Sequence, residues 1–367
     1  MAGLSTKDKE VIKKLEVLGN QLVSQINKGD NPSMELPVRS LGNIFFDQKS
    51  RTIKLGDKTS ERQFLNIAHT RKFMQTTLVA NEIKKVIQQN ATVSIRDLYY
   101  ALKHTIEGTQ ENTFEDQSES DPLVEDVEAS LNLLREELHL AASAKGIIAG
   151  DMVVQDGKDI IDLAKMGSGG WSVPSNVEED RIEIKKMKAD YVLFIEKDAV
   201  WRRFNEDKFW EKNNCIIITG RGQAARGERR FVQRLSREHK LPVYALMDAD
   251  PWGMYIYSVI KQGSISLSYS EEKLATPDTK YIGLTVGDVD KFKIPKEVTI
   301  KLNTLDLKRL DELKSYEWFK HKKWQQEFDL MKEKNIKMEL EALSKKGIRF
   351  ITEEYLPRKI KDEDFLP

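Results

Sequence analysis

The sequence predicts a multidomain α/β protein, in which a mostly helical N-terminal part precedes a domain built on a parallel β-sheet. Short apolar runs alternate with helical segments from residue 186 onward, which is the pattern of open α/β sheets. A Gly/Ser/Pro-rich stretch at residues 166–177 separates this pattern from the helical part. The chain has 367 residues, of which 40% are apolar, and this is enough for two or three domains with their own cores.

Residues 1–60 are expected to form an amphipathic helix and a hairpin. Apolar residues recur at intervals of three or four along one helical stripe: Leu4, Val11, Leu15, Leu18, Leu22 and Ile26. The sequence Gly-Asp-Asn-Pro at residues 29–32 is expected to end this helix, and residues 41–55 are predicted to form a short hairpin. Because few core residues precede the stripe, we expect it to pack on another subunit or on a distant part of the chain.

Residues 61–165 show the order of elements found in a winged-helix (CAP-like) domain of the helix-turn-helix type. Ser94 and Asp97 form a capping box that starts one of the helices. The expected elements are helices at residues 62–89, from 95 and at 127–140, followed by strands within 147–161. In such domains the second helix of the motif enters a DNA groove.

A linker is expected at residues 166–185, and a Rossmann-like domain with a parallel sheet is expected at residues 186–367. Its apolar strands are predicted at residues 191–195, 215–219, 243–247 and 281–286. The charged segment at residues 305–343 is predicted to form a helical C-terminal extension. Cys215 is the single cysteine, so the chain can form no intrachain disulfide and no cysteine zinc site.

The charge pattern is more informative than the net charge, which is zero with 59 basic and 59 acidic residues. Residues 111–128 hold eight acids and no base, which we interpret as solvated surface. Residues 221–240 hold six Arg and one Lys, which suits either plain surface or a phosphate-binding face. The candidate DNA contacts in this basic run are Arg221, Arg226, Arg229 and Arg230. With no run of about 18 apolar residues and a charged start, the sequence predicts a cytoplasmic protein without membrane spans.

Two adjacent tyrosines on the helix that begins at residue 95 are predicted to have different surroundings. A helical wheel places Tyr99 in an apolar sector with Ile95, Leu98 and Leu102. Tyr100 falls on the far side, together with the polar residues Arg96, Asp97, Lys103 and His104. Of these, Lys103 and His104 are further candidate DNA contacts. Tyr100 is therefore the exposed tyrosine, suited either to polar chemistry beside Arg96 or to an ordinary surface position.

Three acids follow strands of the predicted sheet. Glu196 comes directly after one strand, and Asp248 and Asp250 come directly after another. Ligands of open α/β sheets bind at the carboxyl ends of the strands, so these acids can converge on one edge. Closely spaced carboxylates repel unless a cation neutralises them, and oxygen ligands without His or Cys favour Mg²⁺. The simpler alternative is that isolated acids cap the following helices.

A hydroxyl nucleophile in a DNA-reading domain and a Mg²⁺ site in another suggest transfer of a phosphodiester to the protein. A tyrosine phenol has a pKa near 10 and needs nearby cations to react. The phosphotyrosyl ester keeps the energy of the broken bond, so the strand could be rejoined without a high-energy cofactor.

Several motifs together resemble the A-subunit family of archaeal DNA topoisomerase VI, which is related to the eukaryotic meiotic protein that makes programmed double-strand breaks. They lie in the family's order: Arg-Asp-Leu-Tyr-Tyr at residues 96–100, Gly-Gly-Trp-Ser-Val-Pro-Ser-Asn at 169–176, Glu196 after its strand, and Asp-Ala-Asp-Pro-Trp-Gly at 248–253. The similarity covers nearly the whole chain. It favours Tyr100 as the catalytic residue over an ordinary surface tyrosine.

The resemblance implies a winged-helix domain followed by a Toprim domain, in a homodimer that cuts double-stranded DNA. Tyr100 would form the 5′-phosphotyrosyl link, Arg96 would support the phosphate, and Mg²⁺ would be held by Glu196, Asp248 and Asp250. The tyrosine of one protomer would work beside the metal of the other. In the family, a separate GHKL-type B subunit binds ATP and completes an A2B2 assembly. This chain has no Gly-x-x-x-x-Gly-Lys-Ser/Thr phosphate loop, which agrees with ATP binding by that partner.

The leading hypothesis is therefore the cutting and rejoining component of an ATP-dependent type IIB topoisomerase, which relaxes supercoils and decatenates DNA. Alternatives are a recombination protein that cuts without rejoining, a Toprim metal-dependent nuclease in which Tyr100 is a bystander, and a non-catalytic DNA-binding module.

Overall fold

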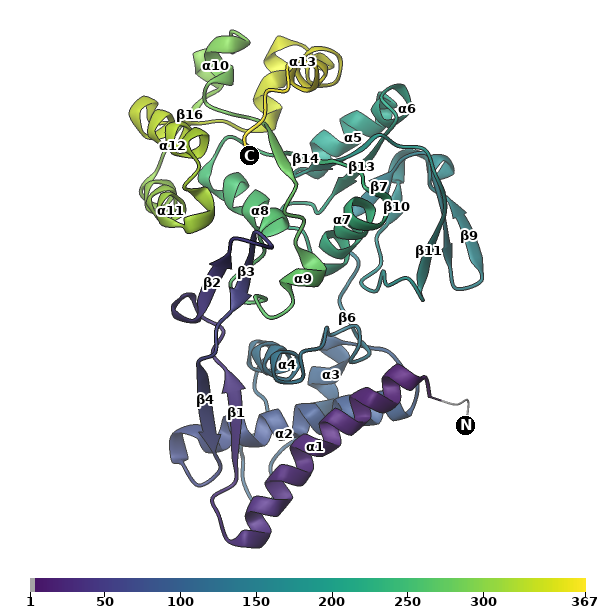
Figure 1. Ribbon diagram of the computed structural model, residues 1–367, viewed down its shortest axis with the longest axis vertical. Helices are drawn as coiled ribbons and strands as arrows, with labels where there is room; N and C mark the ends of the chain where they lie inside the picture. The colour runs from purple at the N-terminus through teal and green to yellow at the C-terminus, as the bar shows by residue number, and fades with distance from the viewer. Residues whose placement is uncertain (1–3) are drawn as a thin grey trace. The chain divides into compact units, whose positions relative to one another are not determined.

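The computed structural model describes residues 4–367, which form two compact units (Figure 1). The first unit comprises the chain up to Phe45 together with Lys54–Ser143 and Ile265–Ser270. The second comprises Phe46–Ile53, Ala144–Ser264 and Glu271–Pro367. The hairpin expected at residues 41–55 is confirmed as β2 (Ile44–Asp47) and β3 (Thr52–Leu55), and the division between the units falls within it.

The first unit is mainly helical. Its elements are α1 (Thr6–Lys28), β1 (Ser33–Pro37), β4 (Thr59–Gln63), α2 (Ile67–Gln88), β5 (Val93–Ser94), α3 (Ile95–Leu102), α4 (Gln117–Leu131) and β6 (Leu140–Ala141). Strand β1 pairs antiparallel with β4, and β5 pairs parallel with β6. Val11 and Leu15 of α1 join a buried cluster with Val79 and Ile83 of α2. The N-terminal half of the α1 stripe thus packs on a distant part of the chain, which is one of the two partners expected for it.

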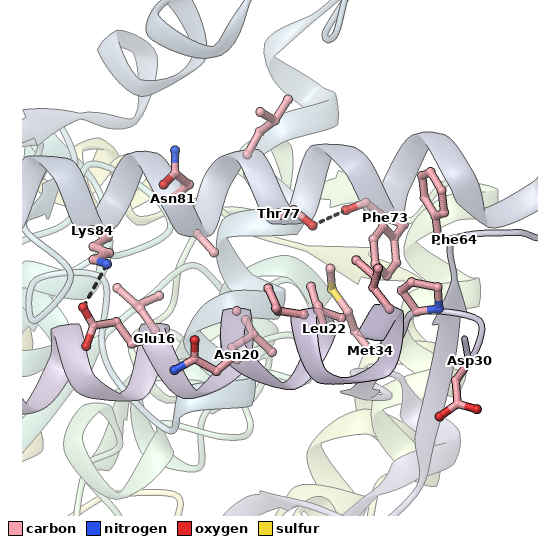
Figure 2. A pocket seen from close by; sticks show the side chains of 18 of the residues that line it. Glu16, Asn20, Leu22, Asp30, Met34, Phe64, Phe73, Thr77, Asn81 and Lys84 are labelled. Atoms are coloured by element: carbon pink, nitrogen blue, oxygen red, sulfur yellow. Dashed lines mark hydrogen bonds and ion pairs between the residues drawn. The ribbon is translucent and has the colours of Figure 1, made fainter. Parts of the chain in front are cut away.

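The C-terminal half of the α1 stripe borders an apolar groove of about 860 Å³ (Figure 2). Leu22, Met34 and Phe73 line this groove, and the ion pair of Lys84 with Glu16, at 2.9 Å, lies toward one end of it. Ile26 also lines it and is 59% exposed. A contact of this face with another copy of the chain remains a prediction.

Helix α4 begins about ten residues earlier than the sequence analysis predicts, inside the acidic stretch. Asp116 caps the helix by accepting a hydrogen bond from the Ser118 N–H. Asp126 is 7% exposed and pairs with Arg39 at 2.8 Å and Arg62 at 2.5 Å. The interpretation of residues 111–128 as solvated surface is therefore wrong for the inner face of this helix, because distant arginines neutralise its acids.

The second unit is built on a six-stranded mixed sheet in the order β10-β7-β13-β12-β14-β15. Its strands are β7 (Ile147–Ala149), β10 (Trp171–Ser172), β12 (Tyr191–Ile195), β13 (Cys215–Thr219), β14 (Val243–Leu246) and β15 (Lys280–Gly283). The last four are parallel, as the sequence predicts, whereas β7 runs antiparallel to both of its neighbours, β13 and β10. Cys215 is buried in β13, and its thiol is free.

Helices cover both faces of this sheet. They are α5 (Asp198–Glu206), α6 (Phe209–Lys212), α7 (Arg226–His239), α8 (Pro251–Lys261), α9 (Glu271–Leu274), α10 (Asp288–Lys291), α11 (Thr304–Ser315), α12 (Lys322–Lys334) and α13 (Leu356–Lys361), with a short β16 (Ile300–Lys301) pairing β17 (Ile336–Lys337). Phe194 packs in one buried cluster with α7, α8, α11 and α12, whereas Leu193 packs in another with α5, α6 and α13. Strands buried on both faces explain the continuous apolar runs in the sequence.

The stretch at residues 166–185 is not a linker. Its β10 joins the main sheet, and β11 (Ile182–Met187) pairs with β8 (Met152–Asp156), which also pairs with β9 (Asp159–Asp162). A Cβ on Gly170 would lie 2.6 Å from the Trp201 ring, so this glycine permits close packing rather than flexibility. The unit boundary lies instead between Ser143 and Ala144, and the strands expected within residues 147–161 belong to the second unit.

No helix between residues 4 and 367 is both long and apolar enough to cross a membrane.

Candidate active site

The capping box predicted at Ser94 starts α3 and fixes which tyrosine faces outward. The Ser94 hydroxyl accepts from the Asp97 N–H at 3.0 Å, and an Asp97 carboxylate oxygen accepts from the Ser94 N–H at 3.1 Å. Tyr99 is 7% exposed, and its hydroxyl donates to the Glu115 carbonyl at 2.9 Å. Tyr100 is 60% exposed. The exposure of Tyr100 and the burial of Tyr99, predicted from the helical wheel, are confirmed.

Arg96 lies one helical turn before Tyr100, as the spacing requires. The guanidinium carbon of Arg96 is 6.0 Å from the centroid of the Tyr100 ring. A guanidinium at this distance is attracted to the ring face and remains available to an anion beside the hydroxyl. The pair can therefore present a nucleophilic oxygen and a positive charge on the same side of α3.

Lys103 and His104 form hydrogen bonds within the first unit. The Lys103 ammonium donates to the Tyr99 hydroxyl at 3.0 Å and to the Glu115 carbonyl at 2.9 Å. A ring nitrogen of His104 lies 3.1 Å from the Leu102 carbonyl. Their proposed contact with DNA remains a prediction.

The three acids of the second unit follow two neighbouring parallel strands, β12 and β14. Glu196 comes directly after the first strand, and Asp248 and Asp250 follow the second. The Asp248 N–H donates to Glu196 Oε2 at 3.0 Å, so these two residues are in direct contact. Asp250 caps α8 by accepting from the Gly253 N–H at 2.6 Å. The helix-capping alternative therefore holds for Asp250 and does not account for Glu196 or Asp248.

Burial and mutual repulsion disfavour the charged forms of these acids. Glu196 is 8% exposed and Asp248 is 4% exposed. Burial, and then the neighbouring Asp248, raises the pKa of Glu196 to about 8. Burial raises the pKa of Asp248 to about 6, although the Leu340 N–H and the Lys197 ammonium oppose that shift. Burial also raises the pKa of Asp250. A divalent cation would remove the cost of ionising all three.

The donor set suits Mg²⁺, which prefers carboxylate oxygens. A backbone N–H binds one oxygen of each acid: Glu196 Oε2, Asp248 Oδ1 and Asp250 Oδ1. Each carboxylate thus retains a second oxygen that these bonds do not use. Nevertheless, within the described part of the chain no three acidic, His or Cys side chains form a ready-made metal cluster.

Lys197, Glu339 and Glu341 surround the site, and Tyr281 holds one of its loops. None of these four residues was predicted from the sequence. Lys197 pairs with Asp248, Glu339 and Glu341. The position of Lys197 next to Glu196 could have indicated it. Glu339 and Glu341 are far away in the sequence and gave no signal. The fourth is Tyr281, whose buried hydroxyl donates to the Asp248 carbonyl at 2.8 Å and holds the loop after β14.

The four arginines of the basic run have different surroundings. Arg229 is only 2% exposed and pairs with the buried Glu271 at 2.5 Å, so it cannot reach a phosphate in this structure. Arg230 forms two bonds to Glu178, at 2.6 and 2.7 Å. Arg221 is 42% exposed and pairs with Asp198 at 3.2 Å. Arg226, at the start of α7, is partly exposed. Arg229 is therefore withdrawn as a candidate DNA contact, and the other three remain predictions.

These features define a class of α/β proteins with an acidic site at the carboxyl edge of parallel strands and an exposed tyrosine on a separate helical unit. The family model for the Toprim domain of the topoisomerase 6 A subunit/Spo11 group matches residues 191–360. "Type IIB DNA topoisomerase" matches residues 71–140, and "All-beta domain in DNA topoisomerase VI alpha subunit" matches residues 145–188. The last match begins close to the boundary between the two units.

Full-length relatives agree with these matches. The chain is 46% identical to the A subunit of type 2 DNA topoisomerase 6 from Pyrococcus abyssi, over 98% of this chain and 96% of the relative. It is 43% identical to that of Hyperthermus butylicus, over 94% and 93%. It is 35% identical to the A subunit of DNA topoisomerase 6 from Arabidopsis thaliana, over 96% and 80%. The chain therefore belongs to the A-subunit family of topoisomerase 6, and its second unit contains a Toprim domain.

Proposed function

We propose that this chain is the DNA cleavage and religation subunit of an ATP-dependent type IIB topoisomerase, with Tyr100 as its nucleophile. The observation that carries the proposal is the position of Tyr100, which is 60% exposed beside Arg96 on a helix whose neighbouring tyrosine is buried. Membership in the A-subunit family of topoisomerase 6 supports the same activity.

In the cleavage step, the phenolic oxygen of Tyr100 bonds to a backbone phosphorus as the bond from phosphorus to the 3′ oxygen breaks. The phenol loses its proton, and the departing 3′ oxygen gains one. Arg96 would stabilise the negative charge of the phosphate during this exchange. The reverse step releases Tyr100 and restores the phosphodiester, so no external energy is needed for rejoining.

Glu196, Asp248 and Asp250 are proposed to hold Mg²⁺ at the carboxyl edge of β12 and β14. When bound, the cation would stabilise the charge that develops on the phosphate oxygens. Glu196 and Asp248 already contact each other through the Asp248 N–H, at 3.0 Å, and this bond orients the Glu196 carboxylate.

The proposed assembly follows from the family. Two copies of this chain would place the tyrosine of one protomer beside the acids of the other, and a GHKL-type B subunit would bind ATP and complete an A2B2 complex. The capped helix α3 is the proposed recognition element of a winged-helix domain, and the parallel strands β12 to β15 support a Rossmann-like description of the Toprim domain. We place the complex on chromosomal DNA in the cytoplasm.

The test compares Tyr100→Phe with Tyr99→Phe in the presence of the B subunit, ATP and Mg²⁺. Tyr99→Phe removes a buried hydroxyl and is the matched control. We expect covalent protein–DNA complexes from the wild type and from Tyr99→Phe, and none from Tyr100→Phe, with DNA binding nearly unchanged in all three. A 5′-linked adduct formed by Tyr100→Phe would show that the nucleophile is another residue.

A break-initiating recombination protein is the second candidate, because the matching Toprim family model joins the topoisomerase 6 A subunit with Spo11. Such a protein would form the same adduct without rejoining the strands. Reversal of the adduct when Mg²⁺ is removed by chelation would favour the topoisomerase. A metal-dependent nuclease would instead leave free 5′ ends, and Tyr100→Phe would still cut.

A further inference from the structure

The ammonium of Lys197 lies among carboxylates from separate segments of the second unit. Its Nζ is close to three oxygens: 3.0 Å from Asp248 Oδ2, 3.1 Å from Glu339 Oε2 and 2.9 Å from Glu341 Oε2. Only 24% of the Lys197 side chain is exposed, so solvent screens these pairs only in part. The positive charge therefore sits at the edge of the sheet where the divalent cation is proposed to bind.

Lys197 makes Asp248 different from the other two acids. Backbone N–H groups engage one oxygen of Glu196 and one of Asp250, and leave the second oxygen of each for a cation. In Asp248, the Leu340 N–H binds Oδ1 at 2.8 Å while the Lys197 ammonium holds Oδ2. Asp248 cannot offer Oδ2 to a cation in the same way without loosening its bond to Lys197.

We infer that Lys197 is an internal counterion that competes with the divalent cation for Asp248. This inference rests on the proposed function, because it takes the three acids as the ligands of Mg²⁺. When the cation binds, the ammonium gives up Asp248 and keeps Glu339 and Glu341 as partners. Lys197 thus lowers the affinity of the free chain for the cation and neutralises the carboxylates until the cation arrives.

A purely structural role for Lys197 is less well supported, because backbone bonds already hold the segment that carries Glu339 and Glu341. Ala249 and Met338 exchange backbone hydrogen bonds of 2.9 and 3.0 Å. These bonds fasten the segment to the loop between Asp248 and Asp250 without help from the lysine. Removing the charge should therefore change cation binding more than it changes the fold.

The experiment measures Mn²⁺ binding to the full chain, without DNA or nucleotide, by isothermal titration at one pH and one ionic strength. The variants are Lys197→Met and Lys197→Gln, which remove the charge, and Lys197→Arg, which keeps it. Lys197→Gln keeps hydrogen-bond donors and serves if the methionine variant folds poorly. Lys291→Met is the matched control, because Lys291 pairs with Asp364 at 2.8 Å in the same unit.

Lys197→Met and Lys197→Gln are expected to bind Mn²⁺ about tenfold more tightly than the wild type, because a like charge a few ångströms from the cation is gone. Lys197→Arg is expected to bind like the wild type, and Lys291→Met is expected to show a smaller change. Unchanged or weaker binding by both uncharged variants would overturn the inference while leaving the proposed metal site intact. If the wild type and all variants bind no Mn²⁺, both the inference and the proposed metal site fail.

Discussion

Replacing Arg229 with methionine should lower the free energy of unfolding by roughly 3–5 kcal/mol, because it leaves a buried carboxylate without its cation. Arg229 pairs with Glu271 at 2.5 Å, and neither side chain is more than 2% exposed. The Ser264 N–H, at 2.9 Å, and the Ser264 hydroxyl, at 3.4 Å, also donate to that carboxylate. Methionine fills much of the arginine's apolar volume, so the loss should report charge rather than a cavity.

The pH dependence gives this prediction a second signature. Burial raises the pKa of Glu271, and Arg229 counteracts that rise. Without Arg229 the folded-state pKa of Glu271 moves further above its unfolded value. The penalty should therefore be largest at high pH and should shrink as the pH falls and the carboxyl group takes up a proton.

The assay is urea unfolding of the wild type and of Arg229→Met at pH 8 and pH 5.5, followed by circular dichroism. Arg237→Met, in the last turn of the same helix, is the matched control because Arg237 is exposed. The double variant Arg229→Met with Glu271→Leu should recover most of the lost stability. If Arg229→Met left stability unchanged and instead flattened the salt dependence of DNA binding, the structural role would be refuted.

Four further predictions test other parts of the structure. Ser94→Ala should destabilise the first unit by about 1 kcal/mol, because it removes the cap of α3, and an unchanged melting curve would contradict this. Tyr281→Phe should cost about 1–3 kcal/mol in urea unfolding, since the Asp248 and Leu284 carbonyls lose a buried donor, and no change would show that other groups satisfy them. The pKa of Glu196 is raised to about 8, so the chain in EDTA should lose stability as the pH rises toward that value. In thermal melts at a series of pH values, Glu196→Gln should make the stability depend less on pH. An equally steep pH dependence in this variant would assign the effect to another group. Arg221→Gln should reduce the slope of log binding constant against log salt concentration by about 0.9, the value for one phosphate contact. A slope equal to that of the wild type would show that Arg221 does not contact a phosphate.

The candidate site could be predicted where one local pattern decided the outcome. A helical wheel separates Tyr99 from Tyr100 because a rotation of about 100° per residue moves adjacent side chains to different faces. Glu196 and Asp248 were predictable because neighbouring parallel strands bring their carboxyl ends together at one edge. The apolar runs in the sequence located these strands.

The sequence could not show contacts between distant segments. Lys197 is recognisable as part of the site only in the folded chain, because its partners Glu339 and Glu341 lie more than 140 positions further along the sequence. From the sequence alone, the charge of Arg229 suggests an exposed side chain. It can be buried because Glu271 pairs with it. In each case the partner is set by tertiary packing rather than by local spacing.

The prediction of a linker at residues 166–185 was wrong for a related physical reason. Glycine serves both flexible linkers and tightly packed turns, and composition does not distinguish the two. Gly170 belongs to the second kind, because the Trp201 ring fills the space where a side chain would lie. Trp171 and Val173 beside it are buried in the core of the second unit.

The most direct test of the central claim is to trap the protein on DNA during cleavage and to map the peptide that carries the nucleotide. The proposed A2B2 complex would be denatured in the presence of Mg²⁺ and ATP, the DNA digested, and the modified residue located by mass spectrometry. The structure and the proposed chemistry predict a 5′-linked nucleotide on Tyr100. A nucleotide on any other side chain, or cleaved DNA with free 5′ ends, would contradict the account.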